Sequence, residues 1–248
     1  MSIDADVVIR RAVAEGDAWQ SWRALRLRGE APREAPQIPS QHEEGGFIGP
    51  TGRPSPGATG EGLCHLKILG LTDSGAAAIA GDFLHESRTP AEAWLDSPDD
   101  VAGELDGAAG SRVWATASAA CGLLAIGLDP GERAFMLLRG EADPEGRFTG
   151  GAYPTFAAAG AWWLREGERT EMAEWALRWV REWTEDWWGP WERATALTFW
   201  AAAGIPPENP TVERFLDDLS DEAPSDGWPD DLGLTLRTLE VAHHFNSA

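Results

Sequence analysis

Lysine is nearly absent from this chain. Only one of its 20 basic residues is a lysine, Lys67, and the formal net charge is −21 with no basic stripe to offset it. So acidic a surface repels nucleic acid and anionic membrane surfaces. We therefore expect neither to be a partner.

Cysteines and long apolar runs are also scarce. Cys64 and Cys121 lie within apolar segments, which is typical of buried structural thiols, with a disulfide or a nucleophile as the alternatives. Asp4 and Asp6 precede any apolar run, the opposite of a signal peptide. No stretch approaches the roughly 18 apolar residues of a membrane span. The sequence thus predicts a cytoplasmic protein without membrane insertion.

Glycine and tryptophan are abundant, with 28 and 14 copies. Glycine–aromatic turns recur at 45–47, 146–148, 187–189 and 226–228. Each precedes a segment that is apolar around most of a helical circumference, as in helices buried on nearly every side. These segments are 60–71, 153–164, 191–205 and 232–245, and a fifth at 112–128 lacks an obvious aromatic turn.

Amphipathic segments alternate with the buried ones. They are 75–86, 130–141, 168–185 and 209–222, and 4–28 is available as one more outer helix. A helix–turn–helix repeat of roughly 40 to 60 residues cannot bury its own apolar face, so its copies must stack. We predict an all-α fold, an α/α toroid built as a double-layered barrel of helical hairpins, with an open tetratricopeptide-like superhelix as the alternative.

The length favours a single toroid domain over residues 1–248. Two long irregular stretches, about 29–59 and 89–111, interrupt the helical pattern. Loops this long in a compact domain are typical of functional lids or disordered insertions.

The turns 41–47 and 225–228 resemble the glutamine–tryptophan repeats of the prenyltransferase and squalene-cyclase superfamily, over residues 19–245. The resemblance implies an inner ring of helices around an apolar cavity, in which an isoprenoid folds against aromatic side chains that stabilise a carbocation. For each aromatic residue, packing between helix layers is the alternative. The predicted substrate-binding residues are Trp114, Tyr153, Phe156, Trp188, Trp191, Phe199 and Trp228.

Class II members of that superfamily protonate an alkene or epoxide with the central acid of an Asp-Xaa-Asp-Asp motif, which this chain lacks. The nearest strings are 96–100 and 226–231. The first lies in a long acidic loop and is expected to be solvated, and the second precedes a buried helix, where capping is the alternative. The candidate acids are Asp99, Asp100, Asp230 and Asp231.

Two more polar residues, Glu61 and His65, fall on a segment expected to be buried. Buried carboxyl and imidazole groups must find partners or change protonation, so both are candidates for acid or base work. Capping and core hydrogen bonding are the alternatives.

Metal motifs are weak. Cys64 and His65 are adjacent, so on a helix they point about 100° apart and do not readily share a zinc ion. The string 217–221 reads Asp-Asp-Xaa-Xaa-Asp, the magnesium motif of class I terpene synthases, but too little chain follows for a second motif. We expect a solvated helix end there, and we predict neither a metal site nor a cofactor.

These observations favour a terpenoid-cyclase-like enzyme that cyclises an isoprenoid or another small apolar molecule after protonation by a carboxylic acid. One alternative is a noncatalytic lipid-binding or scaffold protein that retains the toroid. Another is a glycan-active toroid, in which a carboxylate pair flanks the scissile bond. The sequence assigns no oligomeric state.

Overall fold

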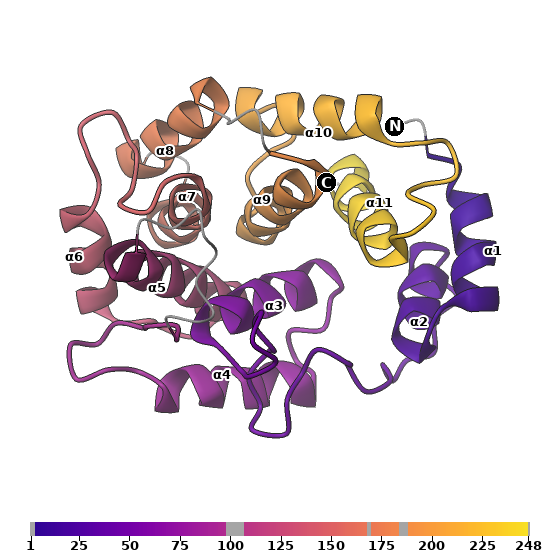
Figure 1. Cartoon of the computed structure of the whole chain (residues 1–248), viewed down its shortest axis with the longest axis horizontal. Helices are drawn as coiled ribbons and strands as arrows, with labels where there is room; N and C mark the ends of the chain where they lie inside the picture. The colour runs from indigo at the N-terminus through magenta and orange to yellow at the C-terminus, as the bar shows by residue number, and fades with distance from the viewer. Residues whose placement is uncertain (1–2, 98–106, 168–169, 184–187, 248) are drawn as a thin grey trace. The chain divides into compact units, whose positions relative to one another are not determined.

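A computed structural model describes residues 3–97, 107–167, 170–183 and 188–247, and its regular elements there are all α-helices (Figure 1). This confirms the all-α prediction. None of the described helices has the length and apolar character needed to cross a membrane. The helices are α1 (Ala5–Glu15), α2 (Ala18–Leu27), α3 (Pro56–Ile68), α4 (Gly75–Glu86), α5 (Gly107–Ala125), α6 (Glu132–Gly140), α7 (Ala152–Glu166), α8 (Glu171–Glu182), α9 (Pro190–Ala203), α10 (Pro210–Glu222) and α11 (Leu232–Ser247).

The chain divides into two compact units. Unit 1 comprises residues 1–39, 187–197 and 206–248, and unit 2 comprises 40–186 and 198–205. Helix α9 therefore contributes its first half to unit 1 and its second half to unit 2. That the chain forms a single domain stays a prediction.

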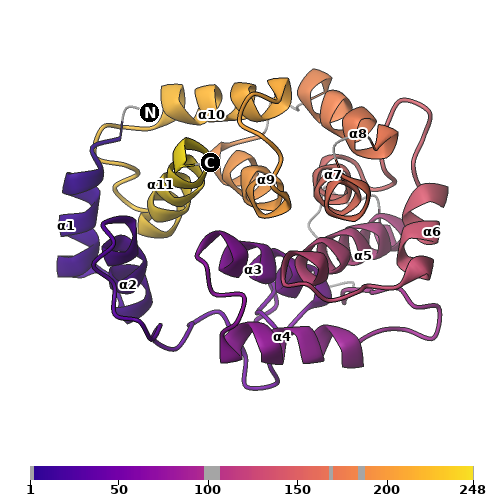
Figure 2. The same ribbon diagram turned by 180° about the vertical axis from the view of Figure 1, so that it is seen from behind.

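Unit 2 has the two layers that the sequence predicts. Helices α3, α5 and α7 pack against one another in chain order, and α4, α6 and α8 each pack against the inner helix next to them in sequence (Figures 1 and 2). The inner helices are buried over most of their surface and are rich in alanine, glycine and threonine. The expected alternation of buried and half-buried helices is confirmed.

Glycines allow α3 and α5 to approach closely. A Cβ atom on Gly60 would lie 2.2 Å from the backbone of Ser118, and one on Gly122 would lie 2.5 Å from the carbonyl oxygen of Gly60. Beside this contact the sulfur atoms of Cys64 and Cys121 are 3.6 Å apart, and both thiols are free and buried. The prediction of buried thiols is confirmed.

A threonine in each of three buried helices, α3, α7 and α11, holds the turn that precedes it. The backbone N–H groups of Phe47, Phe148 and Trp228 donate to the hydroxyls of Thr59, Thr155 and Thr235, at 2.9, 2.9 and 3.0 Å. Each hydroxyl in turn donates to the carbonyl oxygen one helical turn earlier. In each of these helices one threonine side chain thus holds the backbone of the preceding turn against the first turn of the helix.

Helix α5 has such a turn after all, although its sequence shows no glycine–aromatic pair nearby. The N–H of Trp94 donates to the hydroxyl of Thr116 at 3.2 Å, and that hydroxyl lies 3.3 Å from the carbonyl oxygen of Trp94. A long insertion separates the two residues in sequence and hides the repeat. The aromatic residues Phe148, Trp188 and Trp228 recur at intervals of 40 residues, as do Thr155, Thr195 and Thr235.

Replacing Thr155 by valine should destabilise the protein. Thr155 is fully buried, so valine keeps the shape of the side chain but leaves the N–H of Phe148 without its acceptor, at a cost of about 1–3 kcal/mol. Urea unfolding followed by circular dichroism measures the change. Thr72→Val, at a half-buried site, is the control, and equal stability of the two variants would contradict the proposed role of the hydroxyl.

In unit 1 the N-terminal segment forms two helices rather than the single one expected over 4–28. Helix α1 ends at Gly16, and Asp17 starts α2 with a reciprocal capping box to Gln20. Both helices pack against each other and against α11. The core between them contains Val8, Ile9, Ala12, Ala24, Leu236 and Leu239.

A buried ion pair ties α2 to α11. Nε and Nη2 of Arg23 donate hydrogen bonds to the two carboxylate oxygens of Glu240, at 2.6 and 2.7 Å. Both side chains are less than a tenth exposed. Glu240 lies on a segment that the sequence predicts to be buried, and Arg23 is the partner that makes the burial of this carboxylate possible.

Candidate functional site

A buried carboxylate, Asp96, lies at the N-terminus of α3. Its side chain is only 3% exposed, and its Oδ1 accepts a hydrogen bond of 2.9 Å from the N–H of Gly57, the second residue of the helix. The unpaired N–H groups and the dipole of a helix N-terminus favour a negative group there. The expectation that the string 96–100 is solvated is wrong for Asp96.

Trp94 anchors the loop that carries Asp96. Its indole N–H donates to the carbonyl oxygen of Leu84 at 2.7 Å, and the guanidinium of Arg88 lies 4.9 Å from its ring centroid. Trp94 is fully buried. With its backbone also bound to Thr116, this tryptophan fixes the chain two residues before the carboxylate.

The carboxylate of Asp96 faces the indole of Trp114 across Gly57. A Cβ atom on Gly57 would lie 2.4 Å both from Oδ2 of Asp96 and from Nε1 of Trp114. The absence of a side chain at this position is what lets the acid and the aromatic ring come together.

Trp114 belongs to a cluster of four aromatic rings from α5, α7 and α9, and it contacts the other three. Its centroid lies 5.8 Å from Tyr153, 6.0 Å from Phe156 and 5.9 Å from Phe199, all in edge-to-face geometry. Phe156 and Phe199 are fully buried, whereas Trp114 and Tyr153 are partly exposed. The structure thus brings together four of the seven aromatic residues predicted to bind substrate, beside a carboxylate.

Glu61 and His65 lie one and two helical turns after Gly57, on the same side of α3. Glu61 is half-buried and His65 is 8% exposed. Gly60 and Cys64 face α5, and Gly62 packs on the ring of Phe47. The two acid–base candidates therefore extend the side of α3 that begins at Gly57 and Asp96.

Two further candidates in unit 1, Asp231 and Trp228, have structural partners. Asp231 caps α11 through a 2.8 Å hydrogen bond from the N–H of Leu234, and its other oxygen accepts from the indole of Trp191 at 2.7 Å. Asp230 is exposed. Trp228, half-buried, packs on the core between α1, α2 and α11.

Trp188 is buried with its ring edge-to-face against Phe215, 5.7 Å between centroids. Asp99 and Asp100 lie outside the described residues, so the structure says nothing of their surroundings. Of the four candidate acids from the sequence, none is therefore shown beside the aromatic cluster.

The Asp-Asp-Xaa-Xaa-Asp string is part of an ionic network at the end of α10. Asp218 lies 3.5 Å from Arg193 and 3.7 Å from Arg214, and Arg193 also pairs with Glu222 at 2.8 Å. Within the described ranges, no three His, Cys, Asp or Glu side chains gather as a metal-holding group.

The sequence offers the string 96–100 as an acid motif, but its composition does not single out the first residue, Asp96. The signal that points to Asp96 is Trp94, two residues earlier, which repeats the aromatic turn of the other inner helices. The signal is hidden in the sequence because a long insertion separates Trp94 from Thr116, its partner in the repeat.

Comparison with known proteins rests on structure alone. No protein-family model matches the sequence, and no curated protein matches it significantly. Among solved structures, the chain is similar to the type II terpene cyclase MstE from Scytonema in its apo form. The alignment covers 98% of this chain and 87% of that one, with a TM-score of 0.51 and 15% sequence identity.

The fold is a terpene-cyclase-like α/α toroid. In this toroid the buried helices α3, α5 and α7 of unit 2 are the inner layer and α4, α6 and α8 the outer layer. At 15% identity the likeness concerns the fold. The chemistry has to be argued from Asp96 and its surroundings.

Proposed function

We propose that this protein is a terpenoid-cyclase-like enzyme that binds an isoprenoid or another small apolar molecule and cyclises it after protonation by a carboxylic acid. The observation that carries the proposal is Asp96, a buried carboxyl that faces Trp114 across the gap left by Gly57. A buried carboxyl group beside aromatic rings is the arrangement that this chemistry requires, and the helix N-terminus stabilises the carboxylate that remains once the proton has been given up.

In the proposed reaction the carboxylic acid form of Asp96 gives its proton to a carbon–carbon double bond or to an epoxide oxygen of the substrate. A double bond farther along the chain attacks the resulting carbocation and closes a ring. Trp114 and Tyr153, the two partly exposed rings of the cluster, would then stabilise the positive charge through their faces, an interaction that acts within about 6 Å of a ring centroid.

The reaction ends when the cation loses a proton to a base. Glu61 and His65 extend from Asp96 along α3, so they are the candidates for that base. Asp99 and Asp100 remain further candidates for the acid because they follow Asp96 closely in sequence. Asp230 and Asp231 rank below them, since Asp230 is exposed and Asp231 already uses both oxygens in hydrogen bonds.

A substrate screen tests the proposal. Purified protein is incubated, with and without magnesium, with linear polyprenyl diphosphates, polyprenyl alcohols and squalene-type polyenes, and the extracts are analysed by gas chromatography with mass spectrometry. A cyclised product that retains its diphosphate or hydroxyl group is expected. Tight binding of such a compound without any conversion would favour the noncatalytic lipid-binding protein instead.

A further inference from the structure

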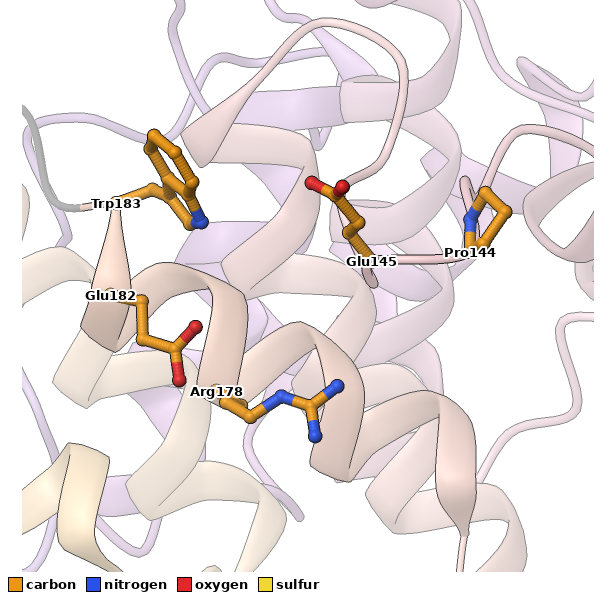
Figure 3. Close-up of a pocket in the computed structure, with 5 residues that line it drawn as sticks. All are labelled: Pro144, Glu145, Arg178, Glu182 and Trp183. Carbon is orange, nitrogen blue, oxygen red and sulfur yellow. The ribbon is translucent and has the colours of Figure 1, made fainter.

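A surface pocket of about 500 Å³ lies between the turn 143–147 and the end of α8, away from the residues discussed so far. It is lined by Pro144, Glu145, Arg178, Glu182 and Trp183 (Figure 3). The carboxylates of Glu145 and Glu182 and the indole of Trp183 converge on the same space, with the guanidinium of Arg178 below Glu145. This volume is within the usual range of small-molecule sites, about 300–1,000 Å³.

Both walls of the pocket are held in place by the fold. In the turn, Oδ1 of Asp143 accepts hydrogen bonds from the N–H groups of Glu145 and Arg147, at 2.9 and 3.0 Å. Gly146 lies directly against the backbone of Trp175 on α8, because a Cβ atom there would be 2.5 Å from it. The backbone that carries the pocket's side chains is therefore preformed.

The pocket's charged side chains have no partner in the part of the chain that the structure describes. Within the described residues, the side chains of Glu145, Arg178 and Glu182 take part in no ion pair or hydrogen bond. Trp183 is 57% exposed. Donors, acceptors and an apolar ring that face one concave space without protein partners are what a ligand site needs.

The turn 41–47 and helix α4 repeat this scaffold without the same chemistry. The turn 41–47 has the same bridge between its ends, with Phe47 in the place of Phe148, and its Gly45 lies against the backbone of Ile79 on α4 as Gly146 lies against Trp175. Counting from Ile79 and Trp175, the positions of Arg178 and Trp183 are occupied by Asp82 and Ser87. The turn and its outer helix thus pack without an arginine or a tryptophan there.

The mixture of charges limits what this pocket can accept. An anion would meet two carboxylates, and a simple cation would meet Arg178. A neutral ring with several hydroxyls suits all the groups, because each hydroxyl both donates and accepts hydrogen bonds while carboxylates only accept and guanidinium only donates. The C–H face of such a ring would lie on the apolar surface of the Trp183 indole. The geometry points to a binding site for a carbohydrate.

The NMR signal of the Trp183 indole N–H can report binding in this pocket. In uniformly ¹⁵N-labelled full-length protein, the indole N–H signal of Trp183 is assigned as the one lost in Trp183→Phe. Glucose, galactose, mannose, N-acetylglucosamine, cellobiose, maltose and trehalose are then titrated to about 10 mM, a range suited to weak sites. We expect saturable movement of the Trp183 signal by at least one of these sugars, with the signal of Trp191, which is 41% exposed, unmoved.

Two variants and a matched control test whether the charged side chains of the pocket bind the sugar. Arg178→Met and Glu182→Gln should each weaken the binding by about tenfold, whereas Glu86→Gln, at the equivalent place on α4, should leave it unchanged. Binding of a neutral sugar should also be insensitive to about 0.5 M sodium chloride, which screens charges. The carbohydrate assignment is overturned if no sugar moves the signal, if Arg178→Met leaves binding intact, or if only a zwitterion such as glycine binds.

Discussion

Replacing Asp96 by asparagine is expected to abolish cyclisation while the protein stays folded. Asparagine keeps an oxygen that can accept the hydrogen bond from the N–H of Gly57, so the cap of α3 is retained. It has no acidic proton to give, and loss of a general acid lowers turnover by about 10²–10⁴-fold even where protonation is not the initiating step. Product formation by gas chromatography and the circular dichroism spectrum are measured side by side.

A matched substitution separates the role of Asp96 from a general effect of charge. Asp230→Asn removes a carboxylate that is exposed, and it should leave turnover close to that of the unchanged protein. An Asp96→Asn variant that keeps more than about a tenth of the turnover would remove Asp96 from the mechanism and direct attention to Asp99 and Asp100.

Gly57→Ala offers an independent approach to the same carboxyl group. The new methyl group would lie 2.4 Å from both Asp96 Oδ2 and Trp114 Nε1, so one or both must move. We expect a large loss of turnover although no ionisable group has changed.

The second large effect concerns stability and the Arg23–Glu240 pair. Arg23→Met should lower the free energy of unfolding by about 3–5 kcal/mol, because it leaves the carboxylate of Glu240 buried without its counter-ion. Urea unfolding at neutral pH measures this loss. A cost below about 1 kcal/mol would mean that water or another group solvates the carboxylate in the variant.

The double variant Arg23→Met with Glu240→Leu should recover most of the lost stability, since both charges are then gone and the volume is kept. Arg28 and Asp6 form an exposed pair at 2.9 Å, in which the hydrogen bond and charge of Arg28 hold the pKa of the Asp6 carboxyl below its usual value. Arg28→Met is the control for loss of an arginine from the same region, and its effect should be small because solvent screens this pair.

Much of the helical layout could be predicted from the sequence because burial leaves a periodic pattern. Helix α4 spans the predicted residues 75–86, and the buried helices α7, α9 and α11 are placed to within a few residues. Helix α3 begins at Pro56, four residues before the predicted segment 60–71. Ser55 caps this helix and Pro56 occupies its first turn, a local signal stronger than the apolar pattern that begins later.

The site was less predictable because its key residue is defined by tertiary contacts. Asp96 lies in an acidic loop whose composition indicates exposure, and only the docking of Trp94 onto Leu84, Arg88 and Thr116 makes it a buried group. The members of the aromatic cluster could be predicted more readily, because all four rings lie on segments whose sequence indicates buried helices. They are Trp114, Tyr153, Phe156 and Phe199. Their contacts with one another depend on how α5, α7 and α9 pack, which no local pattern encodes.

The central claim is that a proton from a carboxylic acid starts the reaction, and isotopic labelling tests it most directly. With a substrate that the protein converts, the reaction is run in D₂O and the product is analysed by mass spectrometry. Because the acid exchanges its proton with solvent before each turnover, the product should carry one deuterium bound to carbon when an alkene is protonated. A cyclised product without deuterium, formed with release of diphosphate, would contradict the account and assign the chemistry to ionisation of the substrate instead.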